Sequence, residues 1–124
     1  MIVRTLSAAK TVEWGHGVSR RLLLAADGMG FTITDTIVAA GSKSKLQYRN
    51  HLEACYCIDG EGEVVDLAGN SVRLRPGILY ALDQNDPHYL IAGPDADLRL
   101  VCVFSPALLG DERHSLDAAE FSHY

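Results

Sequence analysis

The chain is short and acidic, with 124 residues and 11 lysines and arginines against 16 aspartates and glutamates, for a formal net charge of −5. This length predicts one domain that can bury a core, and 48% hydrophobic residues with only 22% charged argue against disorder. The acidic balance, with no basic cluster longer than Arg20-Arg21, argues against a nucleic-acid or anionic-membrane partner.

The cysteines predict the cellular compartment. An odd number of them, with Cys55 and Cys57 separated by one residue in an apolar run, is typical of reduced thiols rather than of a secreted disulfide framework. Met1–Thr5 has no apolar run of the kind found in signal peptides. The stretch Leu22–Ala26 is far shorter than the ~20 residues of a membrane span. We therefore expect a cytoplasmic protein that does not enter membranes.

Glycine and proline separate brief runs rich in Val, Ile, Leu, Tyr and Thr, a pattern typical of an all-β domain. Gly and Asn at 59–62 and 68–71 suit tight hairpins. A small barrel or two-sheet sandwich would limit exposed strand edges. The polar stretch 110–124 could hold a short helix around Leu116–Glu120. The expected strands are Ile2–Leu6, Arg20–Ala25, Phe31–Val38, Leu46–Asn50, Ala54–Ile58, Glu63–Leu67, Val72–Leu74, Leu79–Leu82, Tyr89–Ile91 and Leu98–Phe104.

Side-chain alternation along these strands predicts which residues share a face. Glu53 shares its face with Cys55 and Cys57, and if that face points inward, Glu53 is a buried carboxylate that needs a cation or several hydrogen bonds. On the strand expected over Phe31–Val38, one face carries a row of threonines: Thr32, Thr34 and Thr36. That face could be the solvent side of the strand or the polar wall of a cavity.

Two segments have a spacing that resembles the two motifs of the cupin barrels. In the first, Glu53 is followed by Gly60; in the second, Gly69 precedes Pro76-Gly77 and His88 follows. Cupins usually take two histidines and a glutamate from the first motif, and one histidine from the second, as metal ligands. Other residues stand at three of these histidine positions, so the usual ligand set is absent: Gln47, Arg49 and Tyr80.

This departure is itself the pattern of one cupin family, and the chain resembles the L-ectoine synthases from residue 1 to about residue 114. The resemblance implies a single cupin domain over 1–124, with 110–124 as a lid or tail, and a homodimer. It also implies one Fe(II) bound by Glu53, Tyr80 and His88. The segments that carry it are Met1–Arg4, Ser19–Leu24, Asp27–Phe31, His51–Val64, Pro76–Asp83, His88–Leu90 and Arg99–Phe104.

The resemblance implies a hydro-lyase that acts on a small molecule. In that family the free α-amine of N-γ-acetyl-L-2,4-diaminobutyrate attacks the acetamide carbonyl, water is lost, and the cyclic amidine ectoine, a compatible solute, is formed. Three metal ligands of the types carboxylate, phenol and imidazole suit Fe(II), Mn(II) or Zn(II) and leave open positions for substrate or water. A Lewis acid would help because an amide is a poor electrophile.

Further residues take roles from the same resemblance. Tyr48, Glu112 and His114 are the implied catalytic residues, with Glu112 and His114 as an acid/base pair. The family favours the cavity interpretation of the threonine row, while Cys55, Cys57, Trp14, His16 and His51 are expected to be structural. Cys102 could equally be a small buried hydrophobe. The implied substrate-binding residues are Ser19, Arg21, Thr36, Tyr48, Cys102 and Phe104.

Three departures from the family leave alternatives open. Gly17 stands where a tryptophan is common, with Trp14 three residues earlier; 105–108 differs from the usual Asn-Pro-Pro-Leu; and the tail after His114 lacks the common acidic, Gly- and Pro-containing pattern. A divergent enzyme could act on a related small amide or in the hydrolytic direction. A non-catalytic cupin that binds a small ligand is the second alternative.

Overall fold

The fold is built from short strands, as the sequence predicts. The computed structural model describes residues 1–114 and 122–123. Within these ranges the helical segments are two 3-10 turns, η1 (Leu6–Ala8) and η2 (Ala25–Asp27), and no helix is long and apolar enough to cross a membrane. The strands are β1 (Lys10–Glu13), β2 (Gly17–Arg21), β3 (Thr32–Val38), β4 (Lys43–Gln47), β5 (Leu52–Asp59), β6 (Gly62–Asp66), β7 (Ser71–Leu74), β8 (Leu79–Leu82), β9 (His88–Ala92), β10 (Leu98–Ser105) and β11 (Ser122–His123).

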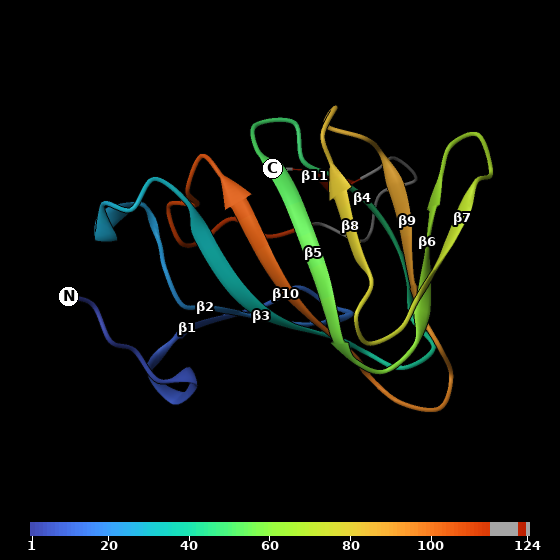
Figure 1. Cartoon of the computed structure of the whole chain (residues 1–124), viewed down its shortest axis with the longest axis horizontal. Coiled ribbons are helices and arrows are strands. Elements are labelled where there is room, and N and C mark those ends of the chain that lie inside the picture. The colour runs from blue at the N-terminus through green and yellow to red at the C-terminus, as the bar shows by residue number, and fades with distance from the viewer. Residues whose placement is uncertain (115–121, 124) are drawn as a thin grey trace.

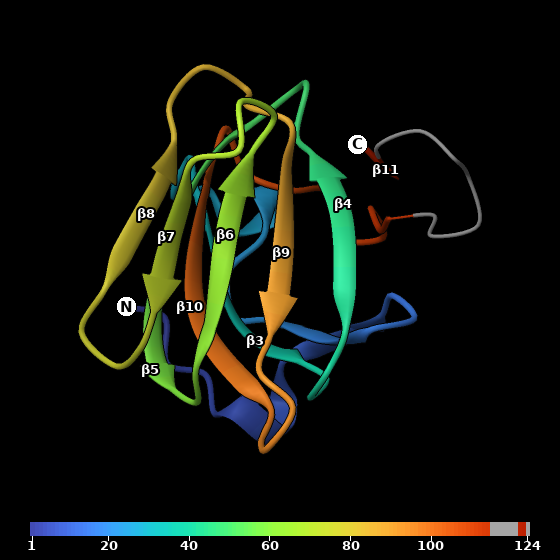
Figure 2. The ribbon, with the colours of Figure 1, turned by 90° about the vertical axis from the view of Figure 1, so that its right-hand side faces the viewer.

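Two sheets lie face to face, as the two views in Figures 1 and 2 show. One sheet has the strand order β1-β2-β3-β10-β5-β8, and the other has the order β11-β4-β9-β6-β7. Neighbouring strands pair antiparallel, except that β11 runs parallel to β4. Side chains from the inner faces fill the space between the sheets, and Val38, Leu74 and Leu98 are fully buried there. The predicted all-β, two-sheet architecture is confirmed.

The structure corrects the predicted elements near the N-terminus. Ile2–Leu6 is not a strand, whereas the polar segment β1 is one, paired with β2. The strand predicted over Arg20–Ala25 ends at Arg21, because the chain then enters η2, where the Leu24 N–H donates to the Asp27 carboxylate. The predictions followed hydrophobicity, but these segments are set by strand pairing and turn chemistry.

Two further predicted elements lie later in the chain. The strand expected over Leu46–Asn50 lies three residues earlier, as β4, because its alternating pattern places Ser44 and Leu46 inward and two lysines outward. Residues 48–51 then leave the sheet. The short helix expected around Leu116–Glu120 lies outside the described residues.

Strands β3 and β5 place polar side chains on the inner face of their sheet. Thr32 and Thr34 are fully buried, so the solvent interpretation of the threonine row is wrong and the row faces the space between the sheets. On β5 the residues alternate as predicted: Glu53 is 5% exposed and Cys55 1% exposed, whereas Tyr56 is 45% exposed. Strands β3 and β5 lie on either side of β10, because β10 pairs with both. Both of these strands therefore turn polar side chains toward the barrel interior.

Candidate active site

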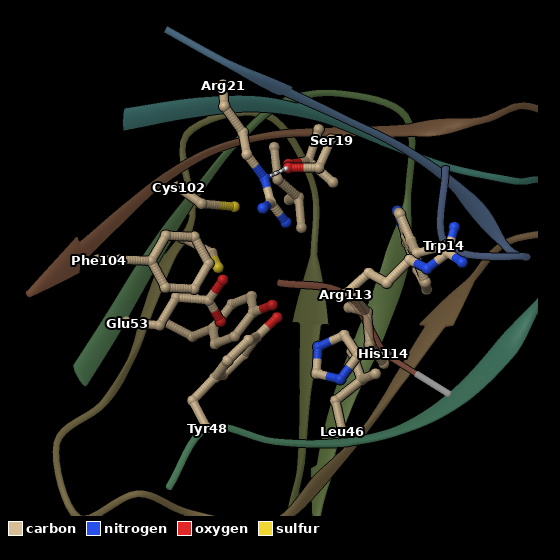
Figure 3. Close-up of a pocket in the computed structure, with 15 residues that line it drawn as sticks. Trp14, Ser19, Arg21, Leu46, Tyr48, Glu53, Cys102, Phe104, Arg113 and His114 are labelled. Atoms are coloured by element: carbon tan, nitrogen blue, oxygen red, sulfur yellow. Dashed lines mark hydrogen bonds between the residues drawn. The ribbon is translucent and has the colours of Figure 1, made fainter. Parts of the chain in front are cut away.

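A cavity opens between the two sheets, and most of the residues predicted to form a site line it (Figure 3). Strands β2, β3, β5, β8 and β10 supply one wall. Strands β4 and β9, the segment after β4 and the chain at 113–114 close the other side. Glu112 does not line this cavity, and neither does His88, which reaches an adjoining hollow that Tyr80 also lines. The predicted residues in the cavity wall are Ser19, Arg21, Thr36, Tyr48, Glu53, Tyr80, Cys102, Phe104 and His114.

Glu53 is the buried acid of this cavity. Burial raises the pKa of its carboxyl group to about 8, although hydrogen bonds with Cys55, Cys102 and Tyr48 act in the opposite direction. No arginine or lysine is recorded in an ion pair with it in the described part of the chain. A buried carboxylate of this kind stays protonated at neutral pH unless a cation approaches it.

Tyr80 lies beside Glu53 because β8 pairs with β5, with Tyr80 opposite Cys55 and Glu53 opposite Leu82. Burial and the neighbouring Cys55 and Glu53 together raise the pKa of the Tyr80 phenol well above its ordinary value. Without a positive charge nearby, the phenol therefore keeps its proton.

His88 begins β9, and its two ring nitrogens have different surroundings. Its Nδ1 lies 3.0 Å from the Asp86 carbonyl oxygen, which can only accept, so Nδ1 carries the proton. Nε2 is buried and has no hydrogen-bond partner among residues 1–114 and 122–123, and burial lowers the pKa of this imidazole, which keeps it neutral. The ring centre lies 6.2 Å from that of Tyr80.

The donor chemistry of these three side chains suits a metal ion. A metal-binding histidine commonly donates one N–H to a backbone carbonyl and offers the other nitrogen to the metal, and His88 has this arrangement. The buried Nε2 would otherwise lack a partner, at a cost of about 1–3 kcal/mol. A divalent cation would also allow Glu53 and Tyr80 to lose the protons that burial makes them keep.

Arg21 holds the chain that follows β10 against the cavity. Its guanidinium is almost fully buried and donates to the backbone carbonyls of Gly110 (2.8 Å) and Glu112, and to the Ser19 hydroxyl (3.3 Å). The Glu112 carboxylate accepts the N–H groups of Leu109 and Gly110, both at 2.8 Å. Glu112 thus fixes the loop that brings the next residues to the cavity.

Aromatic rings form the wall around the polar centre. The Tyr48 ring contacts Phe104 edge to face, with ring centres 5.1 Å apart, and His114 at 4.9 Å. His114 also contacts Trp14, with ring centres 6.4 Å apart. The imidazole of His114 is therefore held at the cavity by packing on two sides.

Some lining residues were not identified from the sequence. Cys55 and Trp14 were expected to be structural but line the cavity, and Arg113 was not considered. Alternation on β5 had placed Cys55 on the same face as Glu53 and could have identified it. The other residues expected to be structural, Cys57, His16 and His51, lie outside this cavity. There the His16 Nδ1 atom forms a hydrogen bond with the Ser44 hydroxyl (2.7 Å), and the His51 Nδ1 atom forms one with the Pro106 carbonyl (2.8 Å).

The displaced tryptophan has a structural reason. At Gly17, with φ +155°, a Cβ atom would overlap the Ile37 carbonyl oxygen and lie 2.9 Å from its carbon. This backbone therefore has no room for a side chain at position 17. Trp14 reaches the cavity instead, from the turn in which its N–H donates to the Gly17 carbonyl.

Comparisons with known proteins show what the whole chain is similar to. The family model described as ectoine synthase matches residues 1–122. An L-ectoine synthase from Desulfatibacillum aliphaticivorans is 52% identical over 108 residues, which cover 86% of this chain and 82% of that protein. The crystal structure of an ectoine synthase from P. lautus superposes with a TM-score of 0.84 at 44% identity, over 89% of this chain and 81% of that one.

A more distant neighbour shows the fold alone. The Cupin_2 domain of an XRE family transcriptional regulator from Enterobacter cloacae superposes with a TM-score of 0.62 at 18% identity, over 73% of this chain and 96% of that one. The predicted cupin-type barrel is confirmed.

Proposed function

The chain belongs to the ectoine synthase family, and from that premise we propose that it is an iron-dependent ectoine synthase. Its substrate would be N-γ-acetyl-L-2,4-diaminobutyrate and its products ectoine and water, which makes it a hydro-lyase. The observation that carries the proposal is the buried Nε2 of His88, which has no hydrogen-bond partner among the described residues and whose ring lies near Tyr80, itself a neighbour of Glu53. The donor chemistry of these three residues suits a metal ion, and Glu53 and Tyr80 line the cavity of a chain whose family is named for this reaction.

The metal ligands would be Glu53, Tyr80 and His88. A Fe(II) ion bound there supplies a Lewis acid that polarises the acetamide carbonyl of the substrate. Glu53 lies on β5, Tyr80 on β8, and His88 is the first residue of β9. Because β5 and β8 pair in one sheet, that sheet fixes two of the three ligands. Rigid strands hold catalytic geometry better than loops do.

The residues around this centre would fold and orient the substrate. Thr36 and Ser19 offer hydroxyl groups in the wall, and Cys102 and Phe104 shape the apolar part. Cyclisation requires the α-amine to lie within reach of its own carbonyl, and a closed wall that holds the folded conformer supplies that proximity. Arg113 offers a charge for the substrate carboxylate, because three donor groups of Arg21 already bind protein atoms.

His114 would take the proton from the attacking amine, and Tyr48 would orient it. The amine must be neutral to attack, which requires a general base at the cavity. The carboxylate of Glu112 has its pKa lowered by hydrogen bonds from Gly110 and Leu109, although burial opposes that effect. A carboxylate held in this way is a weak base, so we assign Glu112 the role of positioning the loop that carries His114.

We propose that the C-terminal segment, which the structure describes at 110–114 and 122–123, acts as a lid over the cavity of this single cupin domain. Arg21 fastens the start of the segment, and Arg113 and His114 line the cavity. At the other end β11 pairs with β4, with Ser122 opposite Leu46, which also lines the cavity. A lid of this kind limits the access of water during a dehydration.

We propose further that the protein is a cytoplasmic homodimer. The outer face of the six-stranded sheet exposes apolar side chains on adjacent strands, where Tyr56 lies opposite Val101 and Leu79. Leu79 is 58% exposed and Val103 39% exposed. Large exposed apolar faces are typical of association sites, and three buried free cysteines suit a reducing compartment.

The activity is tested by anaerobic purification, iron analysis and incubation with N-γ-acetyl-L-2,4-diaminobutyrate, with ectoine followed by NMR. We expect about one iron per chain and formation of ectoine. Iron near one per chain with no ectoine would contradict the proposed substrate. Hydrolysis of ectoine or of a related amide by the same sample would then identify the divergent enzyme.

A further inference from the structure

Two thiols and one carboxylate meet on the inner face of the six-stranded sheet. Cys55 on β5 lies directly opposite Cys102 on β10, and Glu53 precedes Cys55 by two residues on the same face. One donor atom from each of the three lies within 4.8 Å of the other two. All three side chains are buried, and each lines the cavity (Figure 3 labels Glu53 and Cys102).

The distances suit a small tetrahedral metal ion. A zinc ion with Zn–S bonds of about 2.3 Å holds two sulfur atoms about 3.8 Å apart. The three donors would move together by about 1 Å or less to reach that geometry, which strand side chains achieve by small rotations. Thiolates select soft cations, whereas the carboxylate, phenol and imidazole of the other donor set suit Fe(II).

The third cysteine shows that the cluster is specific. Cys57 is fully buried and lies on the same face of β5, yet its Sγ atom points to the carbonyls of Asp59 (3.6 Å) and Gly60 (3.8 Å). It does not line the cavity. The chain therefore carries a matched thiol that is outside the cluster.

We propose that Glu53, Cys55 and Cys102 form a thiolate-rich site for a soft divalent cation such as Zn²⁺ or Cd²⁺. On binding, the two thiols and the Glu53 carboxyl group release their protons to solvent, so that two sulfur atoms and one carboxylate oxygen become metal ligands, with water from the cavity completing the coordination. The site shares Glu53 with the donor set of His88 and Tyr80, so a soft cation held here withdraws that carboxylate. The inference rests on the three donors and does not require the proposed reaction.

The test uses Cd²⁺ alone as the probe. Metal-stripped protein, kept reduced by a phosphine, is titrated with Cd²⁺ while the thiolate-to-cadmium charge-transfer absorbance is followed in the ultraviolet. We expect saturation at one Cd²⁺ per chain. Cys55→Ser and Cys102→Ser should each lower the final absorbance by about half or more, because one of two Cd–S bonds is lost, and Cys57→Ser should leave it unchanged.

The contrary results are equally definite. No charge-transfer band in the folded parent protein, or a band that survives in Cys55→Ser and Cys102→Ser, would overturn the proposal. Folding of each variant is checked by circular dichroism, and Cys55→Ala with Cys102→Ala serve as second variants if serine disturbs the core. His88→Ala separates this proposal from the proposed function: the band should remain although iron is lost.

Discussion

At the scale of residues, Glu53 is the group on which the site depends. Its position was partly predictable, because alternation on one strand placed it on the same face as two cysteines, and the structure shows that this face points inward. The partners that surround it were only partly predictable. Tyr80 and His88 came from a family resemblance, since no local pattern reveals that a histidine has one bonded and one orphaned nitrogen. Trp14 and Arg113 became visible only when the β1–β2 turn and the segment after β10 were placed.

The buried carboxyl group of Glu53 should make the metal-free protein less stable as pH rises. Its pKa of about 8 exceeds the ordinary value of 4.5. Between these values the unfolded chain releases a proton that the folded protein keeps. The free energy of unfolding therefore falls with rising pH, by up to about 1.4 kcal/mol per unit.

Glu53→Gln should remove that dependence. Urea denaturation of chelator-treated protein between pH 5 and pH 8 measures it. Glu13→Gln, at an exposed position of β1, is the matched control and should retain the parental slope. Equal slopes for Glu53→Gln and the parent would show that Glu53 is not protonated in the folded protein.

At the scale of elements, turns and strand pairing decide what hydrophobicity does not. The long inner strands β3 and β10 were predicted nearly in full and β5 over its central residues 54–58, because each has strong alternation and central pairing. The edge element β1 is polar and was missed, and β4 was displaced by three residues. Edge strands show one face to solvent and carry a weaker apolar signal, so their limits depend on contacts distant in sequence.

Two glycines in hairpin turns offer a matched pair of substitutions. Gly60 and Gly69 both have positive φ, +79° and +87°. A Cβ atom at Gly60 would overlap the Asp97 carbonyl oxygen and lie 2.9 Å from the Leu98 Cα atom. A Cβ atom at Gly69 would have no other heavy atom of the described residues within 4 Å. Gly69→Ala should cost about 1–2 kcal/mol, the penalty of left-handed backbone.

Gly60→Ala should cost clearly more than Gly69→Ala, because the start of β10 must move as well. Chemical denaturation at a single pH compares the two variants. Equal losses would mean that the turn after β5 does not pack on the β9–β10 connection as the structure shows.

At the scale of the whole molecule, one sheet faces the cavity with its inner side and exposes apolar side chains on its outer side. Tyr56, Leu79 and Val103 alternate with buried site residues on the same strands. A second copy that covers this face would also stiffen the strands that carry Glu53 and Tyr80. The sequence contains the alternation, but the adjacency of these side chains follows from pairing over 20 or more residues.

Charge on this face should produce monomers. Tyr56→Asp combined with Val103→Asp should shift the protein from dimer to monomer in sedimentation equilibrium, because like charges would face each other across a symmetric interface. Leu67→Asp, at a comparably exposed leucine in the β6–β7 turn, should leave the dimer intact. A parent protein that is already monomeric at micromolar concentration would contradict the proposed homodimer.

The most direct test of the metal-dependent site compares two histidine variants in iron content and turnover. His88→Ala removes the orphaned Nε2, whereas His51→Ala removes a ring outside the cavity that bonds the Pro106 carbonyl. After anaerobic purification, His88→Ala should contain little iron and form no ectoine, while His51→Ala should match the parent in both. Iron at the parental level in folded His88→Ala protein would contradict the site.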